Sequence, residues 1–201
     1  MTRRAVILDR DGTLIDFVRD TELGVVTPAF HPSQIRFLPS ALDALRHILE
    51  SGFFFAVATN QPQAAKGQLP RAAIERTNAA LLARLAEAGV PALGIETCLH
   101  HPEGGEGGDA ELIGPCACRK PKPGLLLSLA ERFDLDLASS FFIGDTPTDV
   151  RAARAAGMRS GLVMELGRCE LCPGRTDPFL GAAPDVSGPN LLEVVRSLLR
   201  S

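Results

Sequence analysis

Short apolar runs alternate with longer amphipathic stretches along the chain. The runs have the length of buried strands, and the first of them ends at Asp9. The amphipathic stretches have the length and periodicity of helices. We expect strands at residues 4–8, 53–58, 94–98, 140–143 and 161–164, and helices at 41–50, 71–88, 125–132, 148–156 and 191–199.

Start signals support these helix boundaries. Ser40 precedes the first helix as a candidate N-cap, and Pro70 and Pro147 open two of the others. Strands that alternate with helices indicate an α/β fold, in which helices cover both faces of a parallel sheet. Sites in such sheets form beyond the carboxyl ends of the strands.

Three stretches lack a regular pattern, and all are long enough to be functional loops. They span residues 16–38, 100–123 and 165–189. No internal repeat or linker divides the chain, so residues 1–201 are expected to form a single domain.

Composition narrows the class of protein. The net charge of −3 provides no basic field for nucleic acid. No stretch approaches the roughly 18 apolar residues of a membrane span, and the N-terminal apolar run is too short for a signal peptide. We therefore expect a cytoplasmic protein with no nucleic-acid or membrane partner.

The first candidate site follows the first strand. Asp9 and Asp11 are two residues apart, so their side chains lean to the same side, and Gly12 permits a tight turn. Two adjacent carboxylates repel each other, and a divalent cation relieves this. The alternative is a strand that ends in an ordinary Asp-Gly turn.

Three further segments carry groups suited to phosphate or metal. Thr59 and Asn60 follow a strand and can bind phosphate oxygens, although Thr-Asn is also a common turn. Arg119 and Lys120 are cations suited to phosphate, although a solvated basic turn explains them equally well. Asp145-Thr-Pro-Thr-Asp149 places two acids around a helix start, where capping is the alternative.

A cluster of cysteine and histidine predicts a zinc site. Cys98-Leu-His100 and Cys116-Ala-Cys118 flank a loop with little apolar content, which a metal would order. Scattered buried cysteines are the alternative. Outside this cluster, Cys169-x-x-Cys172 is interpreted as two free thiols, with a redox role or a second metal as the other options.

Together the four segments, each after an apolar strand and in this order, resemble the motifs of the haloacid dehalogenase (HAD) superfamily. The resemblance implies a Rossmann-like fold and a phosphatase that works through an aspartyl-phosphate on Asp9, with Asp11 as general acid and base. It implies a Mg²⁺ site at Asp9, the backbone carbonyl of Asp11, and Asp145, with Asp149 in support. It also implies phosphoryl binding by Thr59, Asn60 and Lys120.

The zinc loop and the Cys118-Arg-Lys-Pro segment resemble the D-glycero-D-manno-heptose 1,7-bisphosphate 7-phosphatases, relatives of the histidinol-phosphate phosphatases. This implies His100 rather than His101 as a zinc ligand, no cap domain, a small sugar phosphate as partner, and a monomer. Residues 62–67 depart from that group, with Lys66 in place of an Arg, and 16–38 is longer. Both departures concern segments expected to border the substrate.

Other functions remain open from the residues alone. A phosphatase for histidinol phosphate or another small ester shares the same chemistry, and Arg119 next to Lys120 favours a second phosphate on the substrate. A zinc-stabilised binding module without catalysis would be expected to lack the acids at Asp9, Asp11 or Asp145, and all three are present. A phosphomutase would be expected to carry a cap domain, for which the spacers leave no room.

Overall fold

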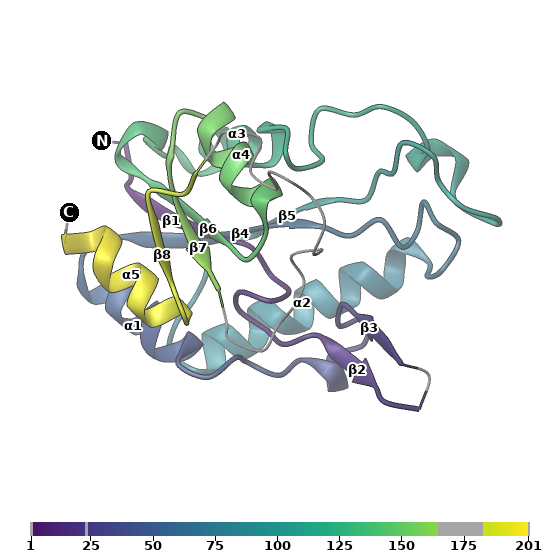
Figure 1. Cartoon of the computed structure of the whole chain (residues 1–201), viewed down its shortest axis with the longest axis horizontal. Coiled ribbons are helices and arrows are strands. Elements are labelled where there is room, and N and C mark those ends of the chain that lie inside the picture. Colours follow the sequence, from purple (N-terminus) through teal and green to yellow (C-terminus); the bar gives the residue numbers. More distant parts are fainter. Residues whose placement is uncertain (1, 23, 165–182, 201) are drawn as a thin grey trace.

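A parallel β-sheet forms the centre of the molecule in the computed structural model, which describes residues 2–22, 24–164 and 183–200 (Figure 1). Within these residues, six strands lie in the order β5-β4-β1-β6-β7-β8. They are β1 (Ala5–Leu8), β4 (Phe54–Asn60), β5 (Ile95–Cys98), β6 (Phe141–Gly144), β7 (Arg159–Val163) and β8 (Val186–Gly188).

Helices cover both faces of this sheet, as predicted (Figure 1). One apolar cluster joins α1, α2 and α5 to the sheet, and a second joins α3 and α4 to the opposite face. Each helix directs an apolar stripe inward, because side chains three and four residues apart share a helix face. The helices are α1 (Ala41–Glu50), α2 (Arg71–Glu87), α3 (Gly124–Phe133), α4 (Pro147–Ala155) and α5 (Leu191–Arg200).

The position of β1 at the centre determines where the candidate site forms. Its four residues are buried, and it pairs in parallel with β4 on one side and β6 on the other. Leu8 lies opposite both Val57 and Ile143. Because the three strands are in this register, the residues that follow them emerge together at one edge of the sheet.

Two stretches that lack a pattern in the sequence contain short strands. Val18–Asp20 (β2) and Val25–Thr27 (β3) form an antiparallel hairpin, and β8 lies within the third stretch. The β-branched residues of the hairpin favour strands, and Gly24 adopts a positive φ of 65° at the turn. Short 3₁₀ turns occur at Pro32–Gln34, Ala110–Leu112 and Leu137–Ser139.

The predicted capping role of Ser40 is wrong. Ser40 occupies the N-cap position of α1, but its φ of 63° is left-handed and its side chain makes no capping hydrogen bond. An N-cap side chain usually accepts from an extended backbone conformation, which Ser40 does not adopt, and its buried hydroxyl has no hydrogen-bond partner among the described residues.

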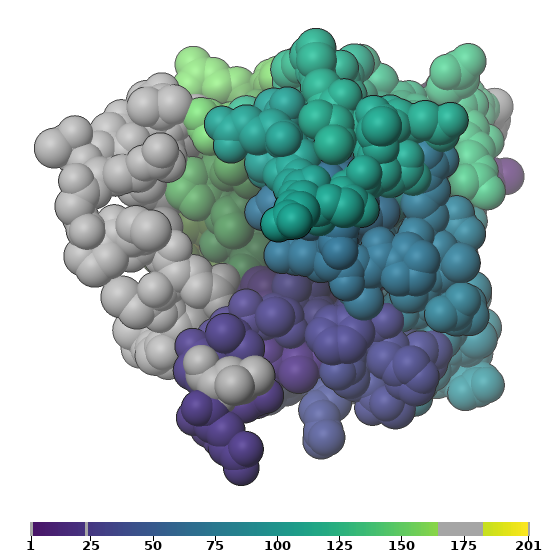
Figure 2. Space-filling view, turned by 90° about the vertical axis from the view of Figure 1, so that its right-hand side faces the viewer, coloured from purple at the N-terminus to yellow at the C-terminus, as the bar shows by residue number. Residues whose placement is uncertain are grey.

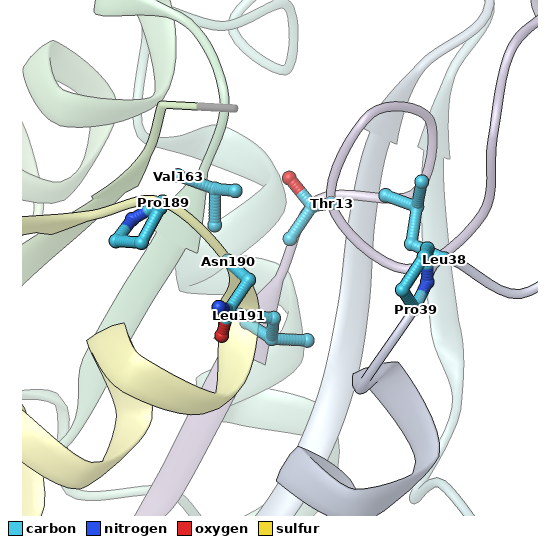
Figure 3. Close-up of a pocket in the computed structure, with 7 residues that line it drawn as sticks. All are labelled: Thr13, Leu38, Pro39, Val163, Pro189, Asn190 and Leu191. Atoms are coloured by element: carbon cyan, nitrogen blue, oxygen red, sulfur yellow. The ribbon is translucent and has the colours of Figure 1, made fainter. Parts of the chain in front are cut away.

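A small cavity of about 40 Å³ lies beside Thr13, between Val163 of β7, the residues just before α1 and the start of α5 (Figure 3). Thr13 lines it together with Val163 and Asn190. The Thr13 hydroxyl is buried without a hydrogen-bond partner among the described residues.

Of the helices that the structure describes, none has the length and apolarity to cross a membrane.

Candidate active site

The turn after β1 brings the first acids to the carboxyl edge of the sheet. The Asp9 amide donates to the Ile143 carbonyl of β6 at 2.9 Å, which continues the strand pairing as far as the carboxylate. Gly12 follows with a φ of 81°, and a Cβ at this position would overlap the Asp145 carboxylate. Only glycine therefore allows the turn to approach the loop after β6.

Lys120 lies between two carboxylates at the centre of this edge. Its Nζ is 2.7 Å from Asp9 Oδ1 and 2.6 Å from Asp149 Oδ1, and it donates to the Ala58 carbonyl at 3.1 Å. Burial alone would lower the pKa of Lys120, but the carboxylates of Asp149 and Asp9 outweigh it and raise the pKa above its ordinary value. The ammonium group is therefore fixed and charged beside Asp9.

Asp9 itself titrates unusually. Burial raises the pKa of its carboxyl group to about 6, and the carboxylates of Asp149 and Asp11 add to this shift, whereas Lys120 opposes it. At neutral pH the group is ionised but poorly solvated, which suits a nucleophile or a metal ligand.

Asp149 is held by the start of α4. Its Oδ2 accepts from the amide and hydroxyl of Thr146 at 3.0 and 2.5 Å, which completes a capping box. A Cβ at Gly144 would overlap the Asp149 side chain. Asp149 therefore caps α4, which was the alternative interpretation of this acid in the sequence. Its other oxygen also forms an ion pair with Lys120.

The acids fit a divalent cation. Carboxylate oxygens of Asp9, Asp145 and Asp149 lie within 4.8 Å of one another. These three acids contribute three negative charges, and Lys120, which pairs with two of them, contributes one positive charge. Two negative charges therefore remain, and Mg²⁺ prefers this kind of oxygen donor.

The last two residues of β4, Thr59 and Asn60, lie beside the backbone of Lys120 at the edge of the site. Asn60 exchanges two hydrogen bonds with the backbone of Lys120, at 3.1 and 3.2 Å. The Thr59 hydroxyl is buried and accepts from Gln61 Nε2 at 2.9 Å. The structure thus brings Thr59 and Asn60 together with Asp9 and Lys120.

Sequence reasoning missed the residues that surround the Asp11 carboxylate. Arg10 is 1% exposed and forms an ion pair with Asp11, with Nε to Oδ2 at 2.9 Å. Gln61 Nε2 donates to the same oxygen at 2.6 Å. The carboxylate of Asp11 accordingly lies outside the acidic cluster of Asp9, Asp145 and Asp149.

The four predicted zinc ligands come together. Donor atoms of Cys98, His100, Cys116 and Cys118 lie within 4.8 Å of one another. The Cys98 sulfur lies 3.8 Å from the Cys116 sulfur, which matches the separation of about 3.8 Å that two thiolates have around tetrahedral zinc. It lies only 2.9 Å from the Cys118 sulfur, and these two would have to move apart to hold the ion. The Arg119 amide donates to Cys116 Sγ at 3.4 Å, as expected beside a thiolate ligand. Three sulfurs and one imidazole nitrogen are a donor set that fits zinc.

Cations gather beside this cluster. Arg119 Nη1 donates to the His100 carbonyl at 3.3 Å, and no carboxylate among the described residues forms an ion pair with it. Burial lowers the pKa of His101, and the nearby charges of Lys66 and Arg119 lower it further. Lys66 and Arg119 thus approach the same imidazole from two segments.

Cys169 and Cys172, which are interpreted from the sequence as free thiols, lie outside the described residues.

Figure 2 views the molecule from the side of this edge, with residues 100–120 at the top, the β2–β3 hairpin at the bottom, and the residues after β4 between them. The glycine-rich part of the upper segment packs on residues 64–67. Arg71 of α2 also binds the upper segment, through ion pairs with Asp109 at 2.5 Å and Glu111 at 2.7 Å.

A parallel sheet with paired acids after β1, a buried lysine and a second acidic pair after β6 defines a phosphoryl-transfer hydrolase of the HAD type. A family model described as HAD-hydrolase-like matches residues 117–171. The chain belongs to the HAD superfamily and is a HAD phosphatase, a phosphoric monoester hydrolase.

Its curated relatives include the D-glycero-beta-D-manno-heptose-1,7-bisphosphate 7-phosphatase of Escherichia coli K12. That enzyme is 34% identical over 164 residues, which cover 82% of this chain and 80% of the relative. The Pseudomonas putida KT2440 enzyme of the same name is 36% identical over 160 residues, with 80% and 82% covered. This chain is therefore homologous to heptose bisphosphate phosphatases.

A solved structure gives the same result. The D,D-heptose 1,7-bisphosphate phosphatase of B. bronchiseptica, in complex with magnesium and phosphate, superposes with a TM-score of 0.72 at 30% identity, and 98% of each chain is covered.

Proposed function

We propose that this phosphatase hydrolyses the 7-phosphate of D-glycero-D-manno-heptose 1,7-bisphosphate through an aspartyl-phosphate on Asp9, with Mg²⁺ as cofactor. The observation that carries the chemistry is the buried ion pair of Asp9 with Lys120, which places a charged ammonium group beside an ionised carboxylate at the sheet edge. The magnesium and phosphate bound to the B. bronchiseptica relative support the cofactor.

In the first step an Asp9 oxygen attacks phosphorus, and the bond between phosphorus and the sugar oxygen breaks. Protonated Asp11 donates its proton to the departing sugar oxygen. Lys120 and the backbone at Asn60 compensate the charge of the transferring phosphoryl group, and the Thr59 hydroxyl binds one of its oxygens.

In the second step Asp11, now ionised, takes a proton from water, and the water oxygen attacks phosphorus. The bond between phosphorus and Asp9 breaks, which releases phosphate and regenerates both acids. Asp9, Asp145 and the Asp11 carbonyl would hold Mg²⁺, with Asp149 in support, and the ion supplies charge compensation at the phosphoryl oxygens.

The substrate assignment rests on Arg119. Its guanidinium lies one residue from Lys120 and has a neutral carbonyl as its partner, so its charge is available to a second anionic group. Lys66 approaches from the facing segment. The ammonium group of histidinol phosphate would meet these cations, whereas the 1-phosphate of a heptose bisphosphate would pair with them.

Catalytic efficiency on three substrates tests this assignment. We expect kcat/KM to be highest for heptose 1,7-bisphosphate, above heptose 7-phosphate and histidinol phosphate. Arg119→Ala should lower kcat/KM on the bisphosphate by about 10-fold or more, the scale of a lost charged hydrogen bond, and affect the other two less.

Arg132→Ala, which removes an exposed arginine of α3, is the matched control and should leave the preference unchanged. Clear preference for histidinol phosphate or for a monophosphorylated sugar would refute the bisphosphate assignment. Equal losses on all three substrates in Arg119→Ala would refute it as well.

We further propose that Cys98, His100, Cys116 and Cys118 hold a structural zinc ion. Purified protein should contain about one zinc per chain, measured by elemental analysis. Cys116→Ser should lower the zinc content and the Tm, and should also reduce activity by about 10-fold or more, because the cluster orders the segment that carries Arg119.

His101→Gln provides the control for this experiment. It alters the neighbouring imidazole, which lies outside the cluster of donor atoms, and should retain zinc. Freshly purified, chelator-free protein without zinc would contradict the proposal.

A further inference from the structure

The carboxylate of Asp11 is held on both oxygens. Oδ2 accepts from Arg10 Nε at 2.9 Å and from Gln61 Nε2 at 2.6 Å. Oδ1 accepts from Arg10 Nη2 at 3.2 Å and from the Ala29 amide at 3.3 Å. Four donors from three segments therefore define the plane of this carboxylate, which otherwise rotates freely.

Arg10 is itself fixed by groups far away in the chain. Its Nη1 donates to Asn78 Oδ1 of α2 at 2.6 Å, and its Nη2 donates to the Ala29 carbonyl at 2.9 Å. Asn78 Nδ2 donates in turn to Thr97 Oγ1 of β5 at 2.9 Å. Because the Asn78 amide has a partner on each side, its oxygen is aimed at Arg10.

Stability alone does not explain this arrangement. Arg10 is almost completely buried, and a buried ion pair gains little net stability, because removing both charges from water offsets their attraction. A rigid planar guanidinium is, however, well suited to orient a carboxylate through two parallel hydrogen bonds.

We propose that Arg10 and Asn78 are positioning residues, which hold the Asp11 side chain in the plane from which it protonates the leaving oxygen. To take up that proton, the Asp11 carboxylate exchanges the longest of its four hydrogen bonds, that from the Ala29 amide at 3.3 Å, for the O–H. This inference rests on the proposed function, in which Asp11 is the general acid. Asn78 acts through Arg10, and Thr97 keeps the Asn78 amide in its orientation.

The dependence of kcat/KM on the leaving group tests the proposal. Propyl phosphate needs a proton on its departing alkoxide, whereas p-nitrophenyl phosphate loses a stable phenolate without one. Since kcat/KM reports the steps up to aspartyl-phosphate formation, the later hydrolysis of the intermediate does not affect the comparison. The variants are Asn78→Ala and Thr97→Val, with Asp11→Asn as the reference.

We expect Asp11→Asn to lose about 10²-fold or more on propyl phosphate and much less on p-nitrophenyl phosphate. Asn78→Ala should show the same selectivity, with a loss of about 10-fold or more on propyl phosphate. Thr97→Val should show a smaller selective loss, and it replaces Asn78→Ala if that variant does not fold.

Thr77→Val is the matched control on the same helix. Thr77 is buried, and its hydroxyl donates to the Ala73 carbonyl within α2, so the effect of its loss should not depend on the leaving group. If the Asn78 and Thr97 variants lose activity equally on both esters, the positioning role is overturned while the phosphatase mechanism stands. If Asp11→Asn itself shows no selectivity, the general-acid assignment in the proposed function is what fails.

Discussion

Asp9→Asn is expected to reduce turnover by at least about 10⁴-fold, the scale on which removal of a nucleophile acts in other hydrolases. The amide cannot form the aspartyl-phosphate, and it also withdraws one carboxylate from the metal cluster. The domain should remain folded, because Lys120 keeps its ion pair with Asp149. Phosphate release with saturating Mg²⁺ measures the activity, and circular dichroism measures the fold.

Asp43→Asn is the control for this variant, since it removes an exposed carboxylate of α1 that pairs with Arg46. It should retain normal turnover. Wild-type activity in Asp9→Asn would refute the covalent mechanism, and loss of its secondary structure would show that the carboxylate serves the fold instead.

Lys120→Met should impair both activity and stability. Without the ammonium group, Asp9 and Asp149 remain buried as like charges, and breaking a buried pair of this kind costs about 3–5 kcal/mol. Activity should fall by about 10²–10³-fold, because a charged donor to the phosphoryl group is lost. Chemical denaturation and steady-state kinetics measure the two effects.

The response of the Tm to Mg²⁺ distinguishes repulsion between Asp9 and Asp149 from a nonspecific loss of stability. The ion supplies positive charge to the same acids, so it should raise the Tm of Lys120→Met more than that of the wild type. Lys122→Met removes an exposed lysine two residues away and should remain near wild type in both assays. Equal Mg²⁺ responses in the Lys120 variant and the wild type would argue against electrostatic repulsion as the cause.

Sequence patterns were sufficient for the residues at strand ends. Asp9, Thr59 and Asp145 each follow an apolar run, and parallel strands deliver such residues to one edge. The hairpin at β2 and β3 was not predicted, because its three-residue strands are too short for a recognisable alternation.

The residues around Asp11 show what pattern reasoning lacked. Arg10 sits inside the recognised motif, yet an arginine is normally expected at the surface, so nothing indicated its burial. Asn78 offered a usable signal, since it lies on the same helical stripe as Ile74 and Leu81. A polar side chain within an apolar stripe must find a buried partner, but the sequence does not reveal which one.

The close approach of the loop between Cys98 and Cys116 to the segment after β4 matters for redesign of substrate preference. Side chains at Gly67, Gly105 or Gly108 would each collide with backbone of the facing segment. The two segments are therefore matched in shape through their main chains, and a side chain introduced at one of these glycines forces them apart. When one of these segments is replaced by that of a relative, the facing segment therefore has to be replaced with it.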